Sequence, residues 1–243
     1  MNAVTLVNEL LSRFGLKEIS SFGGATGSDQ IVALRKVNLA IQMICGRHPF
    51  QWLHKTSTGS ITAVAGTATY SLNSDVKQLL AAKHTYGNGV WLKVMDRQTI
   101  EIVKPDRSDS GDRSTPTHII LFGKTASGSS WLWQVELHPV PDTNFDAQVI
   151  SYYYTIVPTD LSATTDVPII PDDFHWLIVD QAELLWRRGP LRVGGEQSQV
   201  DLYLAAQESV LEGMRQIISQ DNVVGHGEAI WGTNEPSLGI PNV

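Results

Sequence analysis

The stretch Glu136-Leu137-His138-Pro139-Val140-Pro141-Asp142, followed by Val149-Ile150-Ser151-Tyr152-Tyr153-Tyr154, is the part of the chain that decides the fold. The first segment indicates a strand that ends in a turn with two prolines, because proline cannot donate a hydrogen bond within a sheet and is frequent in turns. The second segment indicates an aromatic strand returning from that turn, since tyrosine and β-branched residues favour strands. Together they predict the end of a β-rich region.

Alternation of apolar and polar residues extends upstream from this region to about Lys55, which is typical of half-buried strands. We expect strands at Ser60–Val64, Gly66–Leu72, Val90–Val94, Thr117–Phe122 and Trp131–Leu137. The first two should meet across a tight turn, and a long polar loop should run from Lys104 to Pro116. On one face of the last strand, a row of residues should supply much of the β-core: Trp131, Trp133, Val135 and Leu137.

Helical periodicity precedes the β-rich region. A first helix is predicted over Val4–Phe14, where Gly15 stops the pattern. A second should begin with Ser28 as its N-cap and stop at Gly46. Its apolar face is predicted to consist of Ile31, Leu34, Val37, Ile41, Ile44 and Cys45. The segment Arg47–Leu53 should then form an aromatic corner.

Helical periodicity returns after the β-rich region. A helix is predicted over Asp173–Arg188, with Pro171 at its start and Gly189-Pro190 at its end. It is apolar on most sides and should be the buried centre of the helical part. A last helix is predicted over Glu196–Gln220, with an apolar stripe of Val200, Leu204, Leu211, Met214 and Ile218.

These patterns predict an α+β fold. A helical bundle of residues 1–54 and 168–221 should hold an inserted antiparallel β-domain of residues 55–167, followed by an extended C-terminal arm of residues 222–243. The arm is rich in glycine, and about 20 extended residues reach roughly 65 Å. We expect its isolated apolar residues to be anchors that bind a partner protein or a neighbouring subunit: Ile230, Trp231, Leu238 and Ile240.

Composition narrows the function classes. The formal net charge is −7, which argues against a surface that grips nucleic-acid phosphates, although DNA could pass such a surface without binding. The single cysteine, Cys45, excludes an intramolecular disulfide, and its place on an apolar stripe predicts a buried structural thiol. The first residues lack a signal-peptide pattern, and no apolar run reaches about 20 residues, so we expect neither secretion nor a membrane span.

No pattern of catalytic or cofactor-binding residues emerges. The seven histidines lack metal-ligand spacing, so we expect no metal. Gly23–Ser28 resembles a phosphate-binding loop, but no strand precedes it and no Lys-Ser/Thr pair follows. The pairs Asp172/Asp173 and Asp180/Glu183 could be imagined as glycosidase carboxylates, yet helix capping and solvated helix faces explain them more simply. We therefore predict a protein that is not an enzyme and has no cofactor.

The aromatic strands leave an alternative open. Tyr152, Tyr153, Tyr154, Trp131 and Trp133 could form a stacking platform for sugars or single-stranded nucleic acid. These strands carry no interleaved Lys or Arg, which favours packing in a core. A carbohydrate-binding or glycan-degrading module is accordingly the rival prediction.

Six segments, in order, resemble the head-to-tail adaptors of tailed bacteriophages, also called head completion or tail tubular proteins. The segments are Arg47–Leu53, Ala65–Val76, Ser114–Ile119, Glu136–Asp142, Ile150–Tyr154 and Asp166–Phe174. The resemblance covers roughly residues 28 to 190 and consists of the order and spacing of the motifs, since each one alone is common.

This resemblance implies a structural virion protein at the head-tail junction, assembled in the host cytoplasm. It implies a homo-oligomeric ring of about twelve subunits, a dodecamer, that binds the portal protein on one side and other tail or nozzle proteins on the other. DNA would pass through the lumen during packaging and ejection without specific binding. The helical bundle should form the ring wall, and the β-domain should face outward or toward the tail.

Overall fold

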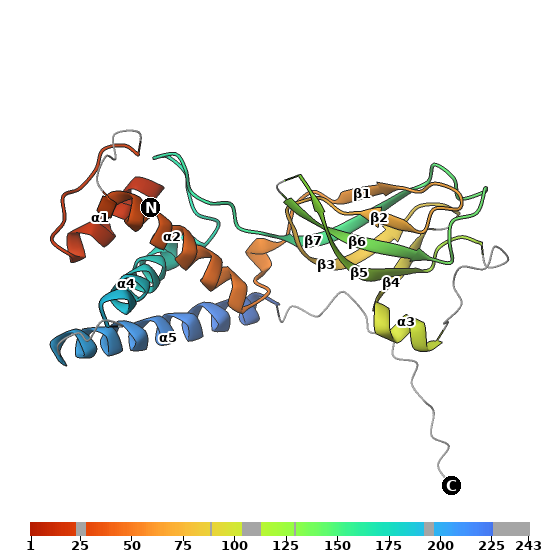
Figure 1. Cartoon of the computed structure of the whole chain (residues 1–243). Helices are drawn as coiled ribbons and strands as arrows, with labels where there is room; N and C mark the ends of the chain where they lie inside the picture. Colours follow the sequence, from red (N-terminus) through yellow and green to blue (C-terminus); the bar gives the residue numbers. More distant parts are fainter. Residues whose placement is uncertain (23–27, 88, 104–112, 129, 192–196, 226–243) are drawn as a thin grey trace, which may run out of the picture. The chain divides into compact units, whose positions relative to one another are not determined.

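In the computed structural model, residues 1–22, 28–87, 89–103, 113–128, 130–191 and 197–225 are described (Figure 1). The chain divides into two compact units. One contains Met1–Gln51 and the chain from Leu161 onward, and the other contains Trp52–Asp160. The first unit is helical and the second is built on a sheet, so the predicted α+β class is confirmed.

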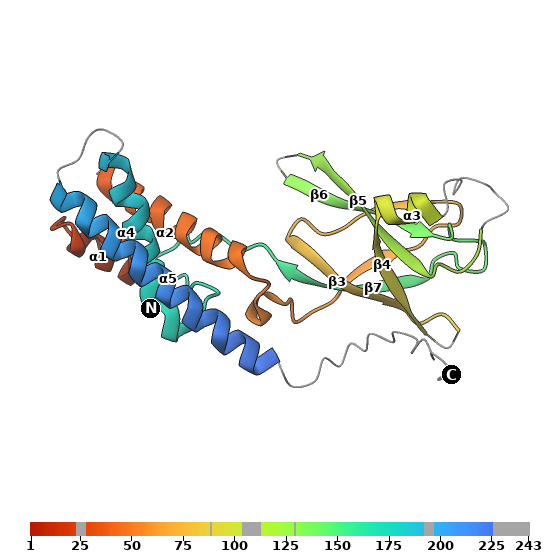
Figure 2. The same cartoon turned by 90° about the horizontal axis from the view of Figure 1, so that it is seen from below.

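The helical unit is organised around one central helix. Its elements are α1 (Ala3–Arg13), α2 (Ser28–Arg47), the 3-10 turn η3 (Asp172–Phe174), α4 (His175–Leu191) and α5 (Gln197–Gly225). Three helices, α1, α2 and α5, pack against α4, and Figure 2 shows α5 crossing it. Leu177, Ile178 and Val179 of α4 are fully buried, as the apolar sequence of this helix predicted.

Local sequence fixes both ends of α1. The Asn2 side chain accepts a hydrogen bond from the Thr5 amide at 3.0 Å and caps the first turn. At the other end, Gly15 adopts a φ of +64°, a conformation that glycine adopts without strain. Its amide and that of Leu16 donate to the last carbonyls of the helix. The face between these ends, including Leu6, Leu10 and Leu11, is completely buried.

The second unit contains a seven-stranded, nearly closed sheet. Its strands are β1 (Gly59–Thr62), β2 (Thr69–Ser71), β3 (Val76–His84), β4 (Val90–Asp96), β5 (His118–Ser127), β6 (Ser130–His138) and β7 (Val149–Ile156), in the order β1-β7-β3-β4-β5-β6-β2. Neighbours are antiparallel except β4 and β5, which are parallel. The helix α3 (Arg97–Val103) lies between those two strands in sequence, because parallel neighbours require a crossover connection. The 3-10 turn η1 (Gln51–Leu53) lies at the boundary between the units.

The core of the sheet combines aliphatic residues with Phe145, Tyr152 and Tyr154. The Tyr152 ring lies so close to Gly59 that any side chain there would overlap it. Its hydroxyl accepts a hydrogen bond from the Asn73 amide at 3.1 Å. Core packing of Tyr152 and Tyr154, the reading favoured by the sequence, is confirmed.

Several strand predictions are wrong. The first two strands do not form a hairpin, because β1 pairs with β7 and β2 pairs with β6. The strands on either side of the double-proline turn, β6 and β7, are not neighbours in the sheet. The sequence patterns predicted neither β3 nor α3. Trp131 is 65% exposed because it pairs with Ala126 near the tip of the β5–β6 hairpin, so of its row only Val135 and Leu137 are fully buried.

The helix predictions need three corrections. Ile31 is exposed, while Ala33 and Ala40 belong to the buried face of α2. The helix α4 continues past Gly189-Pro190 to Leu191. The buried face of α5 contains Val210, Met214 and Ile217, whereas Leu204 and Leu211 of the predicted stripe are exposed. The side chain of Val200 lies outside the described residues.

Candidate interaction surfaces

The residues predicted to bind partners, Ile230, Trp231, Leu238 and Ile240, lie outside the described residues, as do Gly23–Gly27 of the phosphate-loop alternative. Cys45 is fully buried in α2, as predicted for a structural thiol. Within the described ranges, no three His, Cys, Asp or Glu side chains are arranged to hold a metal ion.

Three of the described histidines, His84, His138 and His175, are buried, and the contacts of two of them are structural. In the helical unit, His175 Nε2 lies 2.9 Å from the Ile170 carbonyl oxygen, and burial lowers the pKa of this ring. In the sheet unit, His84 packs edge-on against Phe145, with ring centroids 5.0 Å apart. Burial lowers the pKa of His84, and backbone groups of Pro116 and Tyr86 offset this effect only in part. The lowered pKa favours the neutral form of both rings at neutral pH, so neither is set up as a cationic proton donor.

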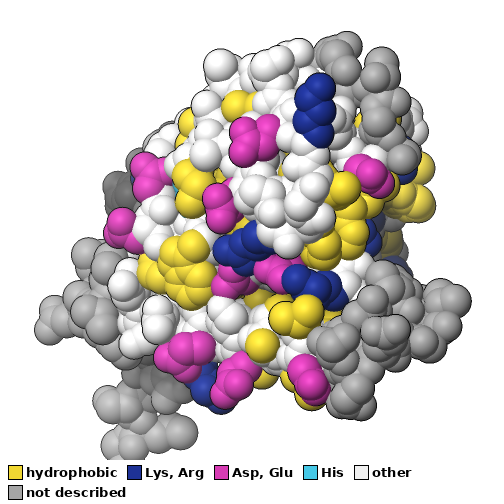
Figure 3. Space-filling view, turned by 90° about the vertical axis from the view of Figure 1, so that its left-hand side faces the viewer, with side chains coloured by type: hydrophobic (Ala, Val, Ile, Leu, Met, Phe, Trp, Pro, Cys, Tyr) yellow, Lys and Arg dark blue, Asp and Glu magenta, His cyan; other side chains and the backbone are white. Residues whose placement is uncertain are grey.

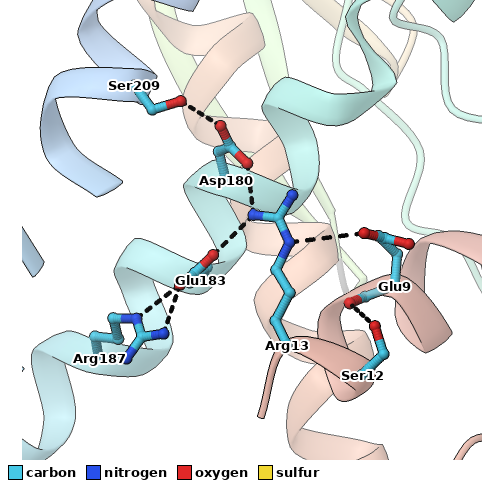
Figure 4. A network of polar contacts seen from close by, with 7 residues as sticks. All are labelled: Glu9, Ser12, Arg13, Asp180, Glu183, Arg187 and Ser209. Atoms are coloured by element: carbon cyan, nitrogen blue, oxygen red, sulfur yellow. Dashed lines mark hydrogen bonds and ion pairs between the residues drawn. The ribbon is translucent and has the colours of Figure 1, made fainter. Parts of the chain in front are cut away.

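The carboxylates Asp180 and Glu183 form a network with arginines (Figure 4). Arg13 of α1 donates to Asp180 at 2.6 Å and to Glu183 at 2.7 Å. Glu183 also accepts from Arg187, at 2.7 Å from both its Nε and its Nη2. On the other side, Ser209 of α5 donates to the second oxygen of Asp180. One connected group of side chains thus joins α1, α4 and α5.

The charges of this network stabilise one another. Burial would raise the pKa of Glu183, but the hydrogen bonds from Arg13 and Arg187 outweigh it and lower this pKa. For Arg13, burial acts to lower the pKa, yet the hydrogen bonds to Glu183 and Asp180 raise it overall. These hydrogen bonds favour the anionic form of Glu183. A glycosidase needs one carboxyl group held protonated, and the arginine contacts of Glu183 oppose that role.

Aromatic packing reinforces the same helix contact. The rings of Phe14 and Trp186 stack with centroids 5.0 Å apart, and the Arg187 guanidinium lies 4.9 Å from the centroid of Phe14. The face of the molecule in Figure 3 shows hydrophobic side chains beside paired basic and acidic ones. Aromatic and charged contacts thus join the same end of α1 to α4.

The solvent-facing side of α5 carries large apolar residues. Leu204 is 53% exposed and Leu211 is 45% exposed, with the exposed Glu208 between them. We call these three residues the α5 outer stripe. They line a shallow hollow of about 630 Å³ together with Gln207, Ser209, Glu212 and Arg215. Exposed apolar residues gathered in one place are typical of an interaction site.

A second such row lies on α2. Ile31 is 44% exposed and Leu39 is 41% exposed, with the exposed Arg35 between them. We call these residues the α2 outer stripe. At 100° per residue they lie on the side of α2 opposite the buried Val37, Ala40 and Ile44. This side of the helix therefore contributes nothing to the core of its own unit.

The sheet unit presents an aromatic surface of its own. Trp91 of β4 is 47% exposed, and its ring centroid lies 5.7 Å from that of Tyr153 on β7. Between these strands, Lys83 of β3 holds its Nζ 5.3 Å and 5.6 Å from the two ring centroids. The alternative stacking platform of Tyr152–Tyr154, Trp131 and Trp133 does not form, since Tyr152 and Tyr154 point into the core. Sequence could not pair Trp91 with Tyr153 because their strands are distant along the chain.

None of the described helices is long and apolar enough to cross a membrane. In comparisons with known proteins, the family model described as SU10 adaptor protein matches residues 1–225. No curated protein matches the chain.

Proposed function

The chain belongs to the SU10 adaptor protein family, and from this premise we propose that it forms a ring joining the portal to the tail of a bacteriophage. The family match, which spans both units, is the observation that carries this proposal. The family is one of structural phage adaptors, so the chain is a virion component and the expectation of a non-enzymatic role agrees with it. The comparisons give no support to the carbohydrate-binding alternative.

We assign separate tasks to the proposed domains. The helical bundle of residues 1–54 and 168–221 would form the ring wall and meet the portal. The β-domain of residues 55–167 would lie outward or toward the tail, where surfaces such as the Trp91 and Tyr153 pair are available to tail or nozzle proteins. A dodecamer of about twelve copies would surround a channel, since a repeated head-to-tail contact closes a ring when its rotation fits.

Charge is consistent with a channel for DNA. The net charge of −7 makes the protein acidic as a whole. An acidic lumen repels phosphate groups, so DNA would pass during packaging and ejection without specific binding.

The segment after α5 would supply the attachment to the portal. The helix ends at Gly225, and the following 18 residues could span about 60 Å if extended. Each subunit would contribute one such arm, with Ile230, Trp231, Leu238 and Ile240 as its anchors. Repetition around the ring would convert weak individual contacts into strong attachment.

The test combines the full chain with purified portal protein of the same virus. We expect a ring-shaped complex by electron microscopy and a matching mass by light scattering. Deleting residues 226–243, or changing the four anchors to serine, should abolish portal association while leaving the helical content unchanged. Thr233→Ala with Asn234→Ala, in the same segment, should leave association intact. If the truncated chain binds the portal as well as the full chain does, the arm has no role in attachment.

A further inference from the structure

The two outer stripes of the helical unit carry opposite charge. The helix α2 has three basic residues and one acidic residue, whereas α5 has four acidic residues and one basic residue. Within the stripes themselves, Arg35 stands between two apolar side chains on α2, and Glu208 stands between two on α5. Each helix therefore presents one charged residue between two apolar ones, and the charges on the two helices have opposite signs.

The spacing of the two stripes also matches. Ile31 and Leu39 are eight residues apart, and Leu204 and Leu211 are seven apart, which correspond to about 12 Å and 10.5 Å along a helix. The charged residue lies near the middle of each stripe. Arg35 would consequently meet Glu208 whether the two helices run parallel or antiparallel, with the apolar residues packed on either side.

We propose that the α2 outer stripe of one subunit packs against the α5 outer stripe of the next subunit. This inference rests on the proposed ring and names the contact that builds it. The contact uses a different surface on each partner, which is the type of interface that generates a ring. The opposite arrangement, in which each stripe meets its own copy, would bring Arg35 against Arg35 or Glu208 against Glu208.

The hollow on α5 suits this occupant. It is lined by Leu204 and Leu211 at its apolar part and by Glu208 and Glu212 at its acidic part. An apolar side chain such as Leu39 can fill the first part while the guanidinium of Arg35 reaches the second. Glu212 already has partners in its own helix, with Arg215 at 3.5 Å and Gln216 at 3.4 Å, so the guanidinium of Arg35 is expected to pair with Glu208.

Charge reversal gives a direct test, with the ring assembled on the portal protein of the same virus. Arg35→Glu or Glu208→Arg should each raise the chain concentration needed for half-assembly about tenfold, because like charges then face each other at every contact. The double variant Arg35→Glu/Glu208→Arg should restore assembly, since opposite charges meet again. Reversals at two exposed positions off both stripes, Lys17→Glu and Glu18→Arg, serve as controls and should have no effect.

Cross-linking tests the same contact without relying on charge. Arg35→Cys and Glu208→Cys chains, prepared separately and mixed before assembly and oxidation, should form a covalent dimer of one chain of each kind. Either variant alone should form no such dimer. The native Cys45 is buried, so the unmodified chain, oxidised in the same way, gives the background level of cross-linking.

The outcomes separate this inference from the proposed function. If the unmodified chain forms no ring with the portal, the proposed function fails. If rings form but neither reversal weakens them, or Glu208→Cys links to the portal instead of to the Arg35→Cys chain, the ring stands and this contact is wrong. Dimers within a single variant would show that the stripes meet their own copies and would overturn the inference equally.

Discussion

Replacing Glu183 by glutamine should destabilise the helical unit by about 2 kcal/mol. The side chain of Glu183 is only 13% exposed and accepts short hydrogen bonds from two arginines. A hydrogen bond to a charged group contributes about 1.5–3 kcal/mol when buried, and an exposed ion pair about 0–1 kcal/mol. Because Arg13 is 31% and Arg187 18% exposed, we assign roughly 1 kcal/mol to each contact.

Urea unfolding followed by circular dichroism at 222 nm reports this loss, because the signal comes mainly from the helices. The matched control is Glu9→Gln, which removes a carboxylate that is 52% exposed and 3.8 Å from the same Arg13. We expect the control to change the unfolding free energy by less than about 0.5 kcal/mol. An equal effect of the two variants would refute the importance we give to Glu183.

The same variant has a defined pH signature. Burial acts to raise the pKa of Glu183, but its arginine partners outweigh this effect and lower the pKa below its ordinary value of 4.5. At acidic pH the unfolded chain therefore binds more protons at this group than the folded chain does. The stabilisation is fully present above about pH 4.5 and is lost as the pH falls through the folded pKa. Glu183→Gln should lose this part of the acid sensitivity of the native protein.

Three further predictions concern packing and burial. Gly213→Ala should destabilise the contact between α5 and α4, because the new Cβ would lie 2.6 Å from a ring carbon of Trp176. The resulting strain of about 1–3 kcal/mol should outweigh the gain in helix propensity of about 1 kcal/mol. Thermal unfolding measures the net loss. Tyr152→Phe should cost about 1 kcal/mol in urea unfolding, since the part-buried backbone amide of Asn73 loses the acceptor that it now has. His84→Phe should reduce the loss of stability that occurs as the pH falls below 6.5. The pKa of His84 is lowered in the folded protein, so the unfolded chain binds a proton at this residue at a higher pH than the folded chain does. Equal changes in the urea midpoint of variant and native protein across this range would contradict the prediction.

Sequence predicted the helices well where one face alone is apolar. In α1, the spacing of Leu6, Leu10 and Leu11 leaves a single choice of buried face, and the structure agrees. In α5 the chain carries two apolar rows, one with Leu204 and Leu211 and the other with Val210, Met214 and Ile217. Periodicity cannot tell which row meets α4, because that depends on the partner helix. Of the stripe predicted as core, Met214 is buried, whereas Leu204 and Leu211 are exposed.

For a related reason, local sequence patterns could not predict the order of the strands in the sheet. Alternation located β1, β2 and β7, but it carries no information on which strands pair across long separations. A hairpin between β1 and β2 was the simplest expectation from their closeness in sequence, and the structure places each beside a distant strand instead. The Trp91, Tyr153 and Lys83 cluster depends on that non-local pairing and could not be foreseen from the sequence alone.

The mass of the chain bound to its portal, measured by native mass spectrometry, tests the central claim most directly. A closed assembly should appear with one fixed number of copies, about twelve, at all protein ratios and with no smaller bound species accumulating. Single copies attached independently, with a number that rises steadily as more chain is added, would contradict a ring-forming adaptor.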